Sequence, residues 1–261
     1  MQPLTLSSAD LTAWLGQFFW PFARVSGLLL VAPLFGSQPI PRRLRLALAL
    51  LVTLAVLPAT RGSAPAVLPW SAGGVLLTAE QLLIGLAMGF VLLLVFNAVA
   101  LAGESIALAM GLGFAVMSDP QNGVPVPVLS QFFLVTASLL FLAMDGHLAL
   151  IHLLAQSFTY LPLDTLHFGA EQAWRLLDWS RYLFTGALAI ALPAVIALLA
   201  VNVAMGVMTR AAPQLNIFSV GFPLTLLVGF VAVLLALPAL PGLFEQGVAG
   251  AWRLIETLLG G

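Results

Sequence analysis

The stretch GGVLLTAEQLLIGLAMGFVLLLVFNAVALA, residues 73–102, determines the class of the fold. It is longer than the roughly 20 apolar residues that an α-helix needs to cross a bilayer, and Glu80 is its only charged residue. Backbone polar groups in lipid must be satisfied inside the segment, which favours a helix. No alternating pattern of about ten residues, typical of a membrane β-strand, recurs in the chain. We therefore expect a membrane helix here.

The composition extends this interpretation to the whole chain. Of its 261 residues 61% are hydrophobic and 7% are charged, whereas soluble domains carry about 25% charged residues. We therefore predict an all-α fold of membrane-type helical hairpins with about six long apolar helices. The other five expected helices lie at 11–33, 44–60, 124–154, 177–209 and 220–244.

Charge and cysteine content exclude several classes of function. The net charge of −1 gives no reason to expect nucleic acid or an acidic substrate, and the absence of cysteine excludes disulfides and thiolate sites.

The N-terminus lacks a basic region and a small-residue cleavage site, so we expect the first apolar run to be retained. Arg42, Arg43 and Arg45 follow that run and favour a cytoplasmic loop there, with the N-terminus outside.

Polar residues divide the apolar runs. The longest polar linker, 155–178, separates a larger N-terminal portion from a C-terminal pair of helices. Asp145-Gly146 predicts a helix junction inside the run 124–154. Residues 242–261, GLFEQGVAGAWRLIETLLGG, predict a short amphipathic helix with a frayed end.

Catalytic and cofactor patterns are weak. Gly111-x-Gly113 follows no strand and has no third glycine at the required spacing, so it does not indicate a dinucleotide site. His147 and His152 are five residues apart and do not share a helix face, so we expect no zinc site. An intramembrane hydrolase would need a nucleophile and a base that the sequence does not offer. We expect neither an enzyme nor a cofactor.

Ionisable residues inside apolar runs are more informative. Arg24, Glu80 and Glu104 would each cost about 3 kcal/mol at a bilayer centre unless paired or facing water. Such residues can form a proton or ion relay or line a pore, or they can pair inside an assembly. Three dispersed charges of mixed sign favour the pairing role. Uncharged polar side chains in the same runs are expected to hydrogen-bond between helices: Asn97, Gln131 and Asn202.

The stretch GLGFAVMSDPQNGVPVPVLSQ, residues 111–131, interrupts the apolar helices. Surface loops are usually polar, and apolar non-helical backbone at membrane depth is tolerated only when buried in protein or lining a cavity. Methionine fills irregular, changing shapes. The pairs Asp119-Pro120 and Asn122-Gly123 predict a turn that leads back to a helix near Val126.

We predict an apolar re-entrant or plug loop over 104–123. The residues alone are equally compatible with a re-entrant helix packed permanently in a core. The residues predicted to form the seal are Met110, Gly111, Leu112, Gly113, Phe114 and Met117.

Three separated blocks resemble the FliR family of flagellar type III export proteins. They are RVSGLLLVAPLFGSQPIPRRLRLALAL (24–50), GESIALAMGLGFAVMSDPQNGVPVPVLSQFF (103–133) and FLAMDGHLALIHLLAQSF (141–158). Each combines glycine, proline or charged positions, and the likeness in spacing covers nearly the whole chain. One departure is that Ala107 and Ala109 stand where the family pattern often has Asp and Gln, so a polar role at these positions is not carried over.

The resemblance implies a non-enzymatic component of the export gate, in the bacterial inner membrane at the flagellar basal body. It implies assembly with several copies of FliP and FliQ into a closed pore for unfolded flagellar subunits, together with FlhB and FlhA. Residues 1–165 would be a FliP-like portion, and residues 166–261 would contain a FliQ-like hairpin, 177–244, with the amphipathic tail.

The competing function is a secondary transporter of a small solute that uses broken helices near the membrane midplane. A transporter would work without FliP and FliQ. It would couple flux to Arg24, Glu80 or Asp145.

Overall fold

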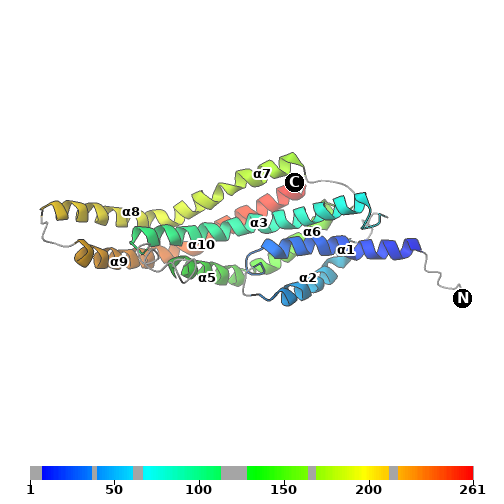
Figure 1. The fold of residues 1–261 in the computed structure, drawn as a ribbon, viewed down its shortest axis with the longest axis horizontal. Helices are drawn as coiled ribbons and strands as arrows, with labels where there is room; N and C mark the ends of the chain where they lie inside the picture. The colour runs from blue at the N-terminus through cyan, green and yellow to red at the C-terminus, as the bar shows by residue number, and fades with distance from the viewer. Residues whose placement is uncertain are drawn as a thin grey trace. The chain divides into compact units, whose positions relative to one another are not determined.

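The computed structural model describes residues 8–36, 40–60, 67–112, 128–163, 169–211 and 217–260. Every regular element in these ranges is helical, which confirms the all-α class (Figure 1). In chain order the elements are α1 (Ser8–Val31), α2 (Arg42–Val56), η1 (Leu57–Thr60), α3 (Ala72–Ala109), α5 (Val128–Ala143), α6 (Gly146–Tyr160), α7 (Ala170–Ser180), α8 (Tyr182–Ala211), α9 (Ile217–Ala236), η3 (Leu237–Ala239) and α10 (Leu240–Leu259).

Several helical stretches have membrane length. Four in the described part of the chain are long and apolar enough to cross a bilayer: Arg42–Thr60, Ala72–Ala109, Ala170–Ala211 and Gly221–Leu259. A bent pair, α5 and α6, gives a fifth if it counts as one span. This agrees roughly with the six expected. The 38 residues of α3 correspond to about 57 Å, well beyond a hydrocarbon core of about 30 Å.

The apolar run 124–154 is interrupted as expected: α5 and α6 meet at an angle of 65°. Asp145 adopts a left-handed conformation with φ 53°, and its N–H donates to the Leu142 carbonyl at 3.1 Å. A left-handed residue cannot continue a right-handed helix. The junction predicted at Asp145-Gly146 is therefore confirmed, and α6 begins at Gly146.

Two boundaries differ from expectation. Most of the polar linker 155–178 is helical in its described part, because α6 continues to Tyr160 and α7 begins at Ala170. The run 220–244 is not one regular helix: it includes the 3₁₀ turn η3, where Pro238 lacks the N–H that an α-helical bond would need.

The amphipathic C-terminal helix is confirmed as α10. Its buried positions recur at intervals of three and four residues: Leu240, Phe244, Val248, Ala251, Ile255 and Leu258.

The chain divides into two compact units by packing. The first consists of Met1–Leu93, Phe141–Ser180 and Gly250–Gly261, and the second of Leu94–Leu140 and Arg181–Ala249. These units follow contacts within one chain. The division expected near residue 165 is of another kind, because it separates a FliP-like portion from a FliQ-like portion. It stays a prediction.

In the first unit, α1 and α3 approach each other at glycines. Gly85 and Gly89 lie one turn apart on α3, and a Cβ atom at Gly89 would lie 2.9 Å from the Leu28 carbonyl oxygen of α1. A Cβ atom at Gly85 would collide with the carbonyl oxygen of Arg24. Small residues at this spacing let two helix backbones pack closely. The approach places the Arg24 segment of α1 directly on α3.

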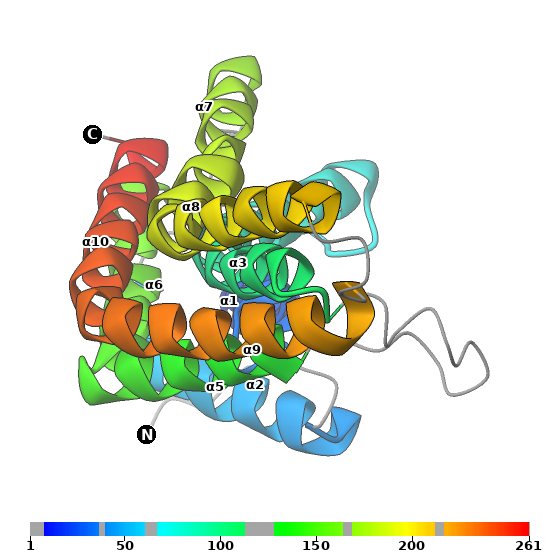
Figure 2. The same cartoon turned by 90° about the vertical axis from the view of Figure 1, so that its left-hand side faces the viewer.

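In the second unit, the α8–α9 hairpin lies beside the C-terminal half of α3. Figure 2 shows α8 and α9 running side by side. The Phe96 ring of α3 meets the Phe244 ring of α10 edge-to-face, with centroids 5.3 Å apart. The Ser130 hydroxyl of α5 donates to the Ala100 carbonyl at 2.9 Å. Elements distant in sequence thus converge on α3.

The glycine crossing leads to a first prediction. Gly85→Ala should lower the free energy of unfolding by about 1–3 kcal/mol, because the added methyl group forces α1 away from α3. Gly73→Ala is the matched control. Its Cβ atom would meet Val67 at an ordinary 3.7 Å, so this change should stabilise α3 by up to about 1 kcal/mol. Unfolding of the purified protein in mild detergent measures both, and equal effects would contradict the crossing.

Candidate functional site

The predicted site residues fall into two groups. The charged residues Arg24 and Glu80 lie in the first unit, and the start of the predicted plug lies in the second. Each group is built from segments far apart in the sequence.

Arg24 is fully buried in α1, and its guanidinium donates four hydrogen bonds. Nε donates to Gln81 Oε1 at 2.8 Å, and one terminal nitrogen donates to the Ser157 carbonyl at 2.8 Å and the Ser157 hydroxyl at 2.9 Å. The other terminal nitrogen donates to the Leu161 carbonyl at 2.9 Å. The guanidinium carbon lies 4.2 Å from the centroid of the Phe158 ring. Arg24 therefore connects α1 to both α3 and α6.

The two carbonyls belong to the C-terminal end of α6. The Ser157 carbonyl already accepts from the Leu161 N–H at 2.9 Å, and the Arg24 guanidinium is its second donor. Both carbonyls lie at the negative end of the helix dipole, so a cation there is favourable. The Phe158 ring adds a cation–π contact. Glu80, which is also buried, supplies the negative charge that acts on the guanidinium. The structure thus brings Arg24 and Glu80 into one buried cluster.

The beginning of the predicted plug forms a helix-ending turn. The Gly111 N–H donates to the Leu108 carbonyl and the Leu112 N–H to the Ala107 carbonyl, both at 3.0 Å. Gly111 has φ 83°. These two bonds and the left-handed residue constitute a Schellman motif, in which glycine is favoured because it has no Cβ atom. Gly111 therefore terminates α3.

The predicted loop starts later than expected. Residues 104–109 belong to α3, and the turn covers Met110 to Leu112. The remaining predicted seal residues, Gly113, Phe114 and Met117, lie outside the described residues.

Met110 is held by the α8–α9 hairpin. Its side chain is fully buried. The Thr225 hydroxyl of α9 has two acceptors in reach, the Met110 carbonyl at 3.2 Å and the Phe222 carbonyl of its own helix at 3.0 Å. Gly229, one turn further along α9, faces the Met110 side chain so closely that a Cβ atom there would lie 2.7 Å from the methionine sulfur. Asn202 Nδ2 of α8 donates to the Ala109 carbonyl at 3.4 Å. Both helices of the hairpin therefore cap the end of α3.

The remaining predicted polar residues point outward in the single chain. Asn97 and Glu104 are exposed on α3, and their spacing of seven residues places them on one face of the helix. Gln131 is exposed on α5. Of the predicted interhelical groups, Asn202 makes the expected contact.

Sequence reasoning missed several partners. Gln81, Ser157 and Thr225 complete the two clusters, and nothing in their local sequence distinguishes them from other polar residues in apolar helices. The glycines were detectable, since Gly85 and Gly89 form a G-x-x-x-G pattern inside an apolar run.

Known proteins resemble this chain over most of its length. The family model described as bacterial export proteins, family 1, matches residues 15–251. The chain belongs to this family. The flagellar biosynthetic protein FliR of Pectobacterium carotovorum subsp. carotovorum is 40% identical over 98% of this chain and 97% of its own length. FliR of Escherichia coli strain K12 is 36% identical over the same shares. FliR of Bacillus subtilis strain 168 is 31% identical over 84% of this chain and 85% of its own.

The match has a direct consequence for the site. The range 15–251 contains Arg24 with all its acceptors and the Met110 turn with its caps from the hairpin. Both clusters therefore lie in the part of the chain that this export family shares. The membrane-length apolar helices agree with a membrane location.

The arginine cluster leads to a second prediction. Arg24→Ala should lower the free energy of unfolding by about 3–5 kcal/mol, because Glu80 and the α6 carbonyls lose a buried cation. Ser157→Ala removes only one acceptor and should cost about 1 kcal/mol. Arg43→Ala, at an exposed position of α2, is the control and should change stability by less than about 0.5 kcal/mol.

Thermal unfolding of the purified protein measures this series. If Arg24→Ala behaves like Arg43→Ala, the cluster is not structural. Normal stability with abolished export would point to a role of Arg24 in transport itself.

Proposed function

We propose that this chain is a component of the flagellar type III protein export gate, which forms a closed pore with FliP and FliQ for unfolded flagellar subunits. The gate lies in the bacterial inner membrane at the flagellar basal body, with FlhB and FlhA as further partners. Membership of the bacterial export family and the similarity to FliR proteins over nearly the whole chain support this proposal.

The structural observation that carries the proposal is an apolar stripe along α8. Seven large apolar side chains, each 43–67% exposed, recur every three or four residues and so follow one face of the helix. The stripe consists of Phe184, Leu188, Leu192, Ile196, Leu199, Val203 and Val207. A face of this length that the described part of the chain leaves exposed fits the packing of helices from neighbouring subunits.

The division into a FliP-like portion and a FliQ-like portion is part of the proposal. In this interpretation α8 and α9 form the FliQ-like hairpin, and the α8 stripe continues the row of subunits around the pore. The chain would join the two kinds of subunit and close the ring. Exposed Asn97 and Glu104 on α3 are the polar groups offered to those neighbours.

The seal of the empty pore is assigned to residues 110–117. A conduit that admits an unfolded chain leaks ions when empty unless apolar, deformable groups fill it, and methionine suits that task. Met110 is anchored to α9 through Thr225 and Gly229. Movement of the hairpin against a neighbouring subunit would therefore act directly on the turn from which the seal begins.

A small-solute transporter remains the alternative function. The observation in its favour is the 65° bend between α5 and α6, with Asp145 at the break, because transporters bind substrates at broken helices. A transporter would work alone after reconstitution. Uptake by the chain without FliP and FliQ would support it over the gate.

The stripe leads to a third prediction. Ile196→Trp and Leu199→Trp should strongly reduce the yield of a complex with co-expressed FliP and FliQ, because a larger ring clashes in a packed interface, whereas fluid lipid adapts to it. Leu51→Trp, at a similarly exposed position of α2 outside the stripe, is the control. Complex yield is measured by affinity copurification and size exclusion. Undiminished yield for both α8 variants would assign the stripe to lipid.

The seal leads to a fourth prediction. Deletion of residues 113–117 removes the central part of the predicted plug and keeps the Gly111 turn that ends α3. We expect the complex to assemble at normal yield and the cells to become permeable to small ions, as measured by membrane-potential dyes. The same deletion without FliP and FliQ should cause no leak. An assembled, ion-tight deletion complex would place the seal in another subunit.

A further inference from the structure

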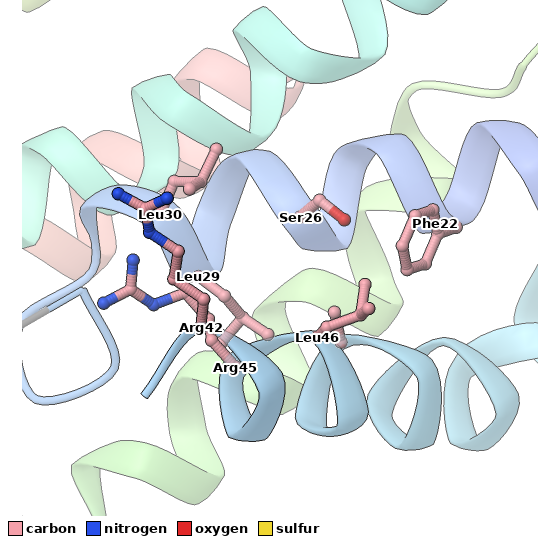
Figure 3. Close-up of a pocket in the computed structure, with 8 residues that line it drawn as sticks. Phe22, Ser26, Leu29, Leu30, Arg42, Arg45 and Leu46 are labelled. Atoms are coloured by element: carbon pink, nitrogen blue, oxygen red, sulfur yellow. The ribbon is translucent and has the colours of Figure 1, made fainter. Parts of the chain in front are cut away.

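A cavity between α1 and α2 in the first unit combines apolar walls with two arginines. Its volume is about 390 Å³. Figure 3 shows the guanidinium groups of Arg42 and Arg45 at one end of the cavity and Phe22 at the other. Apart from the arginines, the lining is apolar with one hydroxyl: Phe22, Ser26, Leu29, Leu30, Leu46 and Ala49.

Both charged side chains that line the cavity are arginines. No carboxylate is among the lining residues, and the first turn of α2 contains no acidic side chain. Arg42 makes no hydrogen bond or ion pair with any residue that the structure describes, and Arg45 Nε donates to the Phe35 carbonyl at 3.0 Å, which holds its side chain in place. Arg42 is also the first residue of α2, so the positive end of the helix dipole adds to the two charges.

The position of the cavity in the chain points to the membrane boundary. Arg42 begins the stretch Arg42–Thr60, which is long and apolar enough to cross a bilayer. Outside the cavity, α2 exposes the apolar side chains of Leu44, Leu51 and Leu54. Basic residues at the end of a membrane helix lie at the level of the lipid headgroups.

We propose that this cavity binds an anionic phospholipid, with the phosphate at Arg42 and Arg45 and an acyl chain along the apolar walls toward Phe22. Guanidinium groups pair with phosphate through charge-assisted hydrogen bonds. The walls suit hydrocarbon, since an apolar chain leaves no polar group unsatisfied in them. An acidic peptide would bring backbone N–H and C=O groups against these walls without partners, which is costly.

The test is a lipid titration of the full-length protein, purified in mild detergent with the subunits that copurify with it. Native mass spectrometry counts bound phosphatidylglycerol and phosphatidylcholine. We expect phosphatidylglycerol to bind preferentially to the unaltered protein. In the Arg42→Gln/Arg45→Gln double variant its affinity should fall about 25-fold, which is about fivefold for each basic residue near an anionic headgroup.

Two further variants distinguish the site from general attraction. Arg43→Gln makes the same charge change at an exposed neighbouring position that does not line the cavity, and it should alter the affinity by less than about twofold. Ala49→Leu places a larger side chain in the cavity and keeps both arginines. It should weaken phosphatidylglycerol binding, and it provides the test if the double variant does not fold.

Several outcomes would overturn the proposal. These are equal binding of phosphatidylcholine, equal losses for Arg43→Gln and the double variant, or no effect of Ala49→Leu. If glycerol phosphate displaced phosphatidylglycerol when both are present at the same concentration, the arginines would bind a phosphate group and the apolar walls would contribute nothing. Displacement of the lipid by an acidic peptide in both the unaltered protein and Ala49→Leu would assign the arginines to a protein partner.

Discussion

The buried guanidinium of Arg24 needs more hydrogen-bond acceptors than any one apolar helix can offer. Its four bonds end on Gln81 of α3 and on the C-terminal end of α6, so three segments must meet at one point. A buried charge without such partners would cost several kcal/mol. The glycines of α3 make the meeting possible, because they let the backbone of α1 come close at Arg24 itself. The packing of the first unit depends on this charge being satisfied.

The same constraint applies to the backbone in the second unit. Helix α3 ends with carbonyl groups that lack helical partners, and an apolar chain offers few ways to satisfy them. The turn at Gly111 satisfies two of them, and the next two are in reach of the Asn202 amide and the Thr225 hydroxyl. This solution ties the end of α3 to the α8–α9 hairpin. In the proposed gate, the seal and the hairpin that contacts neighbours are therefore coupled through hydrogen bonds to one helix end.

Apolar surface is covered in different ways in different parts of the chain. The glycine crossing and the aromatic pair of Phe96 and Phe244 bury it within the chain. The α8 stripe leaves it exposed in a continuous row, which we assign to neighbouring subunits. The cavity beside Arg42 combines it with positive charge, which suits a lipid. The charge and the periodicity of the apolar side chains, rather than their total hydrophobicity, distinguish these three kinds of surface.

The sequence by itself determined the helical class, the membrane character, the junction at Asp145-Gly146 and the amphipathic α10. These features depend on local composition and periodicity, which are visible over one or two turns of helix. It also identified Arg24, Glu80 and Asn202 as residues in need of partners, because a polar group in an apolar run is costly wherever the run packs. The family resemblance came from blocks whose glycines, prolines and charges are likewise local.

Only the tertiary structure decided which residues serve as those partners. Ser157 lies 133 residues from Arg24 in the chain and Thr225 lies 115 residues from Met110, and no local pattern encodes either contact. The later end of α3 has the same origin. Helix α3 runs on to Ala109, where Asn202 of α8 donates to its last carbonyl. The partners of buried charges and of the last α3 carbonyls come from segments distant in sequence, so only the fold determines which residues they are.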